Sequence, residues 1–304
     1  MPNISTVSAK INGQTYALTL NANTGKYEAV ITAPTKSSYT VNDGHYYDVQ
    51  ITAEDTAGNS TMANASTAAL GDSLKLVVKE KTAPVITIKS PTAGATLTSN
   101  VPQIMVEVTD NDSGVNTSSF KLVIDSGAAI GWAKGTATAI SGGYRWTYVP
   151  ESALADGAHT IKVDVSDNDG NAATQKSATI KVDTTPPVLN VTAPTDGVYT
   201  NKTAGVVSGT TNDATSSPVI VTITVNGTDQ GTVTIGANGE FSHNVTYAEG
   251  DNTIVIKAMD AAGKFSTVER TVHVNTVAPK IKVVTITPNP VNAGATYTIT
   301  VEVE

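Results

Sequence analysis

One short pattern occurs three times along this chain and constrains its fold more than any other feature. Each copy consists of a turn, a run of alternating apolar and polar residues, and a second turn that begins Asp-x-x-Gly. The copies span residues 43–59, 156–171 and 249–264. A period of two is typical of a β-strand with one buried and one exposed face. Repetition at this spacing predicts several copies of one structural unit.

A second recurring element predicts where these units begin. Pro84, Pro187 and Pro279 each stand just before a strand-like run, and the intervals between them are 103 and 92 residues. Proline restricts its own φ and the conformation of the residue before it, so these linkers are short and stiff. The predicted domains are 1–82, 83–184 and 185–276, and 277–304 is the start of a further domain or a strand segment. A rod-like array follows from such linkers.

Between these boundaries the sequence predicts short strands separated by turns, with no helical period. Asn12-Gly13 and Asn226-Gly227 are strong hairpin signals. About seven short strands in roughly 90 to 100 residues is typical of a β-sandwich. We therefore predict an all-β chain of tandem antiparallel sandwiches joined by short proline-containing linkers.

Charge and composition exclude several classes of function. The formal net charge is −8, which argues against binding to nucleic acid or to anionic membrane surfaces. The chain has no cysteine, so disulfides, thiolate metal sites and thiol nucleophiles are excluded. No window approaches the roughly 20 apolar residues of a membrane helix, so membrane insertion is not expected.

Three motifs together resemble bacterial immunoglobulin-like domains. They are the Thr-x-Pro starts near Pro84 and Pro187, the Asp110–Val115 loop with the strand after it, and the closing Asp-x-x-Gly hairpin. The resemblance covers nearly the whole chain and is clearest over residues 83–276. It implies tandem immunoglobulin-like sandwiches of the kind found in bacterial surface proteins, accessory modules of secreted glycosidases and phage tails.

Acidic loops provide candidate calcium ligands. Calcium takes six to eight oxygen ligands from flexible loops, and one loop concentrates such oxygens. A second candidate site lies toward the next linker. The residues of the first site are Asp110, Asp112 and Asn116, and those of the second are Asp167, Asp169 and Asp183. The alternative is that Asp and Asn stand here as turn formers. We expect no cofactor, and calcium at these loops is the alternative.

Four aromatic residues form a candidate ligand-binding group. Tyr144, Trp146 and Tyr148 alternate and therefore share one strand face, while Trp132 lies in a glycine-rich insertion. A shared face of this kind is usually a core face. The alternative is an exposed platform that stacks against a cell-surface glycan.

Catalysis is not expected. The histidines at 45, 159, 243 and 273 are scattered, with no metal-ligand spacing. No Gly-x-Ser-x-Gly nucleophile motif is present.

Two functions of different classes fit these features. The first, which we favour, is a structural component of the fibre or baseplate of a phage tail or tail-like particle, located in a virion, that projects toward or binds the host cell surface. If Met1 is the native start, no signal peptide precedes the first strand, which favours this hypothesis. The second is part of an exported adhesin or stalk on the bacterial surface. A carbohydrate-binding accessory module is a third. The expected partners are other particle or surface subunits and a host glycan. The segment 277–304 is expected to be completed by further sequence or to pack on another chain.

Overall fold

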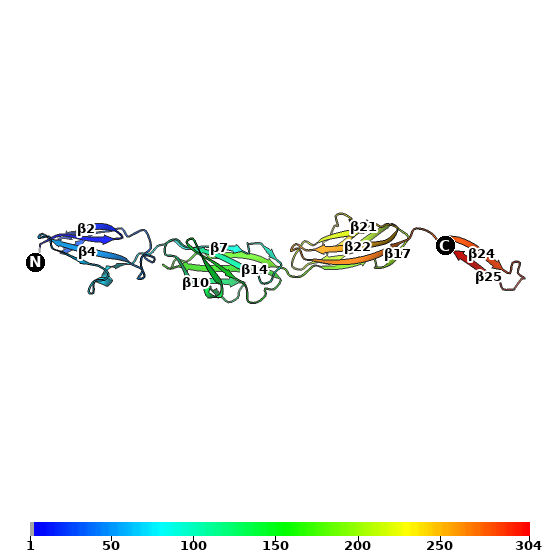
Figure 1. Cartoon of the computed structure of the whole chain (residues 1–304), viewed down its shortest axis with the longest axis horizontal. Coiled ribbons are helices and arrows are strands. Elements are labelled where there is room, and N and C mark those ends of the chain that lie inside the picture. Colours follow the sequence, from blue (N-terminus) through cyan, green and yellow to red (C-terminus); the bar gives the residue numbers. More distant parts are fainter. Residues whose placement is uncertain (1–2) are drawn as a thin grey trace. The chain divides into compact units, whose positions relative to one another are not determined.

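Glycine and asparagine turns divide this chain into short strands, and the computed structural model is all-β, which confirms the predicted fold class (Figure 1). The structure describes residues 3–304. Met1, on which the expectation about export depends, and Pro2 lie outside them. No helix in the described part of the chain is long and apolar enough to cross a membrane. The chain divides into two compact units, one ending at Val182 and the other spanning Asp183–Glu304.

The first strands of the first unit form one sheet in the order β3-β2-β1-β4-β5, with β6 also paired to β4. Asn12 and Gly13 join β1 to β2 with φ of 47° and 80°, as a two-residue type I′ turn requires. This confirms the hairpin predicted there. The elements are β1 (Ile4–Ile11), β2 (Gln14–Asn21), β3 (Lys26–Glu28), β4 (Tyr47–Asp55), β5 (Ser60–Ala63), a 3₁₀ turn (Gly71–Leu74) and β6 (Lys75–Leu76).

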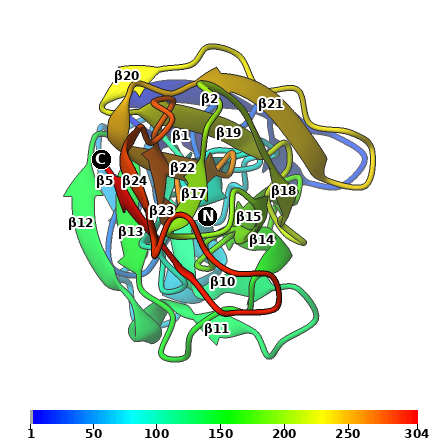
Figure 2. The ribbon, with the colours of Figure 1, turned by 90° about the vertical axis from the view of Figure 1, so that its right-hand side faces the viewer.

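Two sheets follow in the same unit and enclose one apolar core. One has the order β12-β13-β9-β7 and the other β11-β10-β14-β15-β8. Figure 2 shows β12 and β13 side by side in the first of these sheets. The elements are β7 (Val85–Ser90), β8 (Thr96–Leu97), β9 (Ile104–Thr109), β10 (Val115–Ile124), β11 (Ile130–Gly131), a 3₁₀ turn (Trp132–Lys134), β12 (Thr136–Ile140), β13 (Gly143–Tyr148), β14 (Gly157–Asp167) and β15 (Lys176–Val182).

The second unit repeats this two-sheet arrangement around a separate core. Its sheets have the orders β16-β18-β21 and β17-β23-β22-β19-β20. Pairing is antiparallel except between β17 and β23, which matches the parallel pair β15–β8 of the first unit. The strands are β16 (Val188–Ala193), β17 (Val198–Thr200), β18 (Ala204–Asn212), β19 (Ile220–Val225), β20 (Thr228–Asp229), β21 (Glu240–Thr246), β22 (Gly250–Met259) and β23 (Phe265–Val274).

Strict alternation along the central strands builds both cores. In β14, Ile161, Val163 and Val165 are buried and alternate with more exposed residues. In β22, Ile254, Ile256 and Ala258 have no exposed surface. Because side chains point to opposite faces at each step, one face of each strand fills the core. The same inward row continues beyond these apolar residues and reaches an aspartate.

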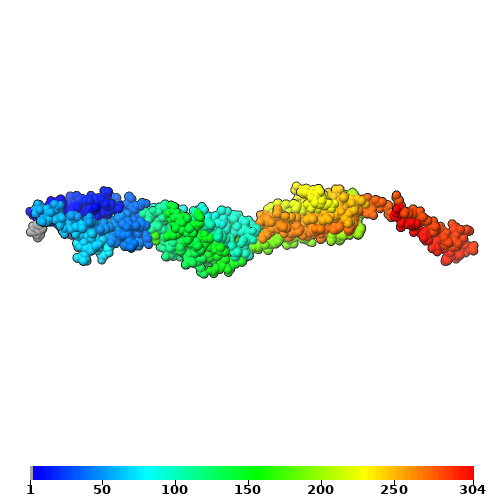
Figure 3. All heavy atoms as spheres, viewed as in Figure 1, coloured from blue at the N-terminus to red at the C-terminus, as the bar shows by residue number. Residues whose placement is uncertain are grey.

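The last two strands, β24 (Ile281–Thr287) and β25 (Thr298–Val303), pair only with each other. Every residue from Asn275 to Glu304 is exposed (Figure 3, orange to red). A two-stranded sheet alone is marginally stable in water. The completion of this segment by further sequence or by a partner stays a prediction.

One histidine is held by hydrogen bonds on both sides of its ring. His159 is buried, its Nδ1 lies 2.8 Å from Oδ2 of Asp125, and its Nε2 lies 2.7 Å from the carbonyl oxygen of Ala155. Burial by itself lowers the pKa of His159, but these two contacts with acceptors outweigh it and raise the pKa above its usual value. Both ring nitrogens face acceptors, which is the arrangement that the doubly protonated ring satisfies.

We expect the stability of the first unit to fall as pH rises through the raised pKa of His159. A raised folded-state pKa adds stability below the unfolded-state pKa, and this stability is lost above the folded-state pKa. Denaturant unfolding between about pH 5.5 and 8.5 measures the effect. His159→Gln should flatten the profile in this range, and an unchanged slope in that variant would contradict the assignment.

Candidate functional site

Six carboxylates form two clusters. Four of them stand at the ends of the inward-facing residues of β9, β14, β18 and β22, and the other two precede the linker prolines. Glu80, Asp110 and Asp167 make the first cluster, in the first unit. Asp183, Asp213 and Asp260 make the second cluster, in the second unit. Within each cluster, one ligand atom from every residue lies within 4.8 Å of the others. Such groups of oxygens suit a hard divalent cation.

The second cluster is the more deeply buried. The exposed fractions of Asp183, Asp213 and Asp260 are 0%, 8% and 3%. Asp213 lies just after β18 and Asp260 just after β22, so each continues the inward-facing row of its strand. Asp183 lies four residues before Pro187, at the start of the unit.

Each carboxylate of the second cluster uses Oδ1 to accept hydrogen bonds within its own turn. Asp183 Oδ1 accepts from the Thr185 N–H at 3.3 Å. Asp213 Oδ1 accepts from the Thr215 N–H at 2.7 Å, and Asp260 Oδ1 accepts from the Lys264 N–H at 2.9 Å. Oδ2 of Asp183 and Oδ2 of Asp260 are buried and have no hydrogen-bond partner.

The first cluster has the same arrangement of carboxylates, but its fully buried aspartate has hydrogen-bond donors on both oxygens. Asp167 has no exposed surface, and Asn171 occupies both of its oxygens. The Asn171 backbone N–H donates to Oδ1 at 2.7 Å, and its side-chain amide donates to Oδ2 at 2.6 Å. Asp110 Oδ1 accepts from the Gly114 N–H at 2.7 Å, and Glu80 Oε1 accepts from the Ser113 N–H at 2.7 Å. The one fully buried carboxylate of this cluster is therefore satisfied by protein donors.

The two clusters occupy equivalent positions of the repeated unit. Glu80 and Asp183 each lie four residues before the linker proline. Asp110 and Asp213 each follow the strand that pairs with the first strand after that proline. Asp167 and Asp260 each begin the Asp-x-x-Gly turn, whose next residue is Asn171 in one copy and Lys264 in the other.

The structure groups the predicted metal ligands differently from the sequence analysis. It places Asp110 and Asp167, from two separate predicted sites, together with Glu80, and it places Asp183 with Asp213 and Asp260. Sequence reasoning missed Glu80, Asp213 and Asp260 as ligands, although their common offsets within the repeat were available as a signal.

The other predicted ligands have separate roles. Asp112 Oδ1 accepts from the Ser37 N–H at 3.0 Å, and Asp169 Oδ2 accepts from the Glu80 N–H at 2.9 Å. The first bond joins the loop between β3 and β4 to the two-sheet domain, and the second joins Glu80, beside the linker proline, to the same domain. Asn116 lies in β10, and its Oδ1 accepts from the Ser118 N–H at 3.1 Å.

The aromatic group lies mainly in the core. Trp146 is fully buried and Tyr148 is 9% exposed, while Tyr144 and Trp132 pack against the same cluster and are partly buried. The Trp146 and Tyr148 rings stack with centroids 5.7 Å apart. Trp146 Nε1–H donates to the carbonyl oxygen of Trp132 at 2.8 Å. A ring with no exposed face offers no stacking surface, so Trp146 serves the core.

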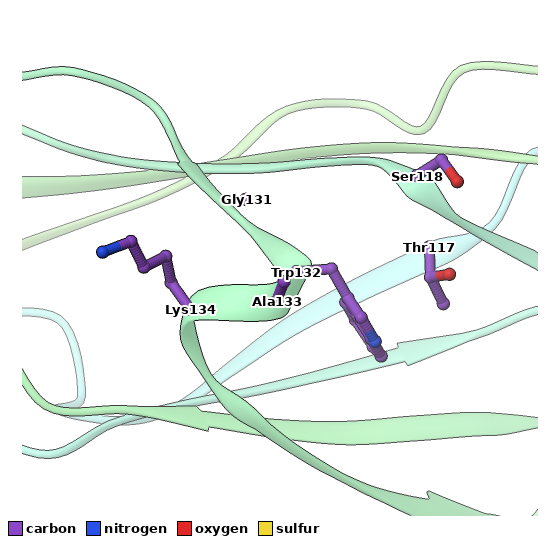
Figure 4. A pocket seen from close by; sticks show the side chains of 6 residues that line it. All are labelled: Thr117, Ser118, Gly131, Trp132, Ala133 and Lys134. Carbon is purple, nitrogen blue, oxygen red and sulfur yellow. The ribbon is translucent and has the colours of Figure 1, made fainter.

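Trp132 also borders a shallow depression on the surface (Figure 4). Thr117 and Ser118 lie across from it, and Lys134 extends in a different direction from the Trp132 ring. Saccharide binding at this depression stays a prediction.

Comparisons with known proteins agree with this architecture. Residues 84–163 match the family model of the bacterial Ig domain, and residues 187–276 match that of glucodextranase, domain B. The chain is 28% identical over 294 residues to halomucin of Haloquadratum walsbyi. That match covers 89% of this chain and spans 3% of the length of halomucin. The chain therefore consists of tandem immunoglobulin-like domains of bacterial type.

Two solved structures illustrate the likeness. Fibronectin(III)-like modules of Clostridium thermocellum CbhA are 19% identical, with a TM-score of 0.37 over 63% of this chain and 94% of theirs. A structure described as bearing on host cell surface retention of a 1.5-MDa bacterial ice-binding adhesin is 21% identical, with a TM-score of 0.32 over 90% of this chain and 88% of that one. At such scores these likenesses carry no argument about function.

Removing the Asn171 amide should destabilise the first unit. In Asn171→Ala the fully buried Oδ2 of Asp167 loses its donor, which costs about 1–3 kcal/mol. Denaturant unfolding measures the change. Gln175→Ala is the matched control, because Gln175 donates to Asp164 at an exposed position. If both variants lost the same unfolding free energy, burial of the Asp167 carboxylate would not explain the loss in Asn171→Ala.

Trp146→Ala should cost about 3–5 kcal/mol of unfolding free energy, as expected for a buried tryptophan. The variant also leaves the Trp132 carbonyl without its indole donor. Val149→Ala, at a position 49% exposed in the same domain, should change stability by less than about 0.5 kcal/mol. A loss at Trp146 as small as that at Val149 would argue against the core assignment.

Proposed function

We propose that this chain is a non-catalytic structural segment of an extracellular or cell-surface protein. The observation that carries the proposal is the recurrence of one immunoglobulin-like unit with a filled core, in a chain similar to halomucin over 89% of its length. In this role each domain acts as a spacer and presents its loops at a set distance along the chain.

The polar groups of the domains support a structural rather than a catalytic role. Both ring nitrogens of His159 are engaged, with Asp125 and Ala155, so neither is free to act as a general base. Each of the six carboxylates in the two acidic clusters accepts a hydrogen bond from a backbone N–H group. Such contacts hold turns and linkers in place.

A component of a phage tail or tail-like particle is the other location in which such domains are expected. The same cysteine-free, acidic chain of tandem domains would serve in either place. The location of the chain in its native producer separates the two hypotheses.

The proposal is tested with antibodies raised against the 304-residue chain. We expect them to label intact, unpermeabilised producer cells and to detect the chain in the envelope or medium fraction. A cytoplasmic marker protein that stays unlabelled shows that the cells are sealed. Recovery of the chain in phage-tail-like particles on a density gradient, with unlabelled cells, would overturn the surface assignment and support the particle.

A further inference from the structure

The second acidic cluster contains buried oxygens that the protein itself does not satisfy. Oδ2 of Asp183 and Oδ2 of Asp260 are both buried without a hydrogen-bond partner, and the carboxylates that carry them are at least 97% buried. They belong to the same cluster, in which ligand oxygens of three residues lie within 4.8 Å of one another. Buried polar atoms in proteins almost always have a partner. In the described part of the chain these two oxygens have no such partner, which leaves room for one from outside it.

Charge leads to the same conclusion. Three carboxylates converge here, and none forms an ion pair with a lysine, arginine or histidine in the described part of the chain. Lys264 is next to the cluster in sequence, and its contact with Asp260 is through its backbone N–H. Buried charges in proteins are paired or coordinate metals.

The first cluster shows how the same fold satisfies such a carboxylate without an ion. There the amide of Asn171 donates to Oδ2 of the buried Asp167. The equivalent residue in the second cluster is Lys264, which has no amide side chain, and Oδ2 of Asp260 is left without a donor. The difference at this one position separates a carboxylate that is satisfied within the protein from one whose second oxygen has no donor.

We propose that Asp183, Asp213 and Asp260 bind one Ca²⁺ ion. All the candidate ligands are carboxylate oxygens, which hard cations prefer, with no nitrogen or sulfur among them. The ligands come from loops after two different strands and from the linker side, and calcium tolerates such irregular sets of ligands. Magnesium demands nearly ideal octahedral geometry and gives up its water reluctantly, so it should bind less tightly.

The ion would join three parts of the second unit. Asp213 follows β18 of one sheet, Asp260 follows β22 of the other sheet, and Asp183 precedes the first strand. A cation held by all three ties both sheets to the segment that enters the unit. The unfolded chain does not hold these carboxylates together, so binding favours the folded state.

The test is calcium binding and thermal unfolding of the whole 304-residue chain after treatment with a chelator. Addition of Ca²⁺ at about 100 times its Kd should raise the unfolding midpoint of the second unit by roughly 10 °C. Titration calorimetry with Ca²⁺ should show one site that is lost in Asp260→Asn and in Asp183→Asn. Magnesium should have a smaller effect at equal concentration.

The variants distinguish ion binding from a purely structural role. Without calcium, Asp260→Asn should be at least as stable as the unsubstituted chain, because it keeps the acceptor for the Lys264 N–H and removes a buried charge. With calcium, it should lose at least tenfold in affinity and most of the rise in midpoint. Asp229→Asn is the matched control, because Asp229 is an exposed carboxylate of the same unit that accepts a hydrogen bond from the Gly231 N–H. It should keep the full calcium response.

Two results would overturn the proposal. One is an unfolding midpoint of the second unit that does not respond to Ca²⁺ in the unsubstituted chain. The other is an equal response in the unsubstituted chain, Asp260→Asn and Asp183→Asn, which would locate any calcium elsewhere, for example at the first cluster. Circular dichroism of each variant before titration establishes that it is folded. If one variant does not fold, the other decides the outcome.

Discussion

The alternation of side chains along each β-strand is the constraint on which the two cores and the acidic clusters depend. An inward row cannot change face without a bulge, so whatever residue stands at the next inward position enters the interior. In β14 this row ends at Asp167, and in β22 it leads to Asp260. The same geometry that buries the apolar residues therefore also buries a carboxylate at one end of the sandwich. The turn after the strand then has to provide its hydrogen-bond donors.

The two two-sheet domains bury an aspartate at the same position but differ in the hydrogen-bond donors that they provide for it. Backbone N–H groups of the following turn serve one oxygen of each buried aspartate in both copies. The second oxygen has an amide donor from Asn171 in one copy and none in the other. One substitution in a turn is sufficient to change the electrostatic requirements of the site, because a fully buried oxygen has no access to water.

In the first two-sheet domain, the loop around Trp132 is likewise shaped by a buried side chain, that of Trp146. The buried indole of Trp146 needs an acceptor, and the 3₁₀ turn at Trp132 provides a carbonyl oxygen 2.8 Å away. A Cβ at Gly135 would lie 2.2 Å from the Trp146 ring, so the glycine leaves room for the indole. The packing of one large side chain thus explains the glycine at position 135. The Trp132 ring itself is partly buried and packs against Phe120 and Tyr144.

The sequence by itself determined the all-β class, the hairpin at Asn12-Gly13, the repeated unit and the acidic character of its loops. These features are local, since period-two alternation and turn residues act over a few positions. Only the tertiary structure decided which carboxylates meet, because Glu80, Asp110 and Asp167 come from segments up to 87 residues apart. It also decided that Trp146 belongs to the core and that two oxygens of Asp183 and Asp260 are buried without donors. Burial and hydrogen bonding depend on how sheets pack against each other, and one strand's sequence does not contain that information.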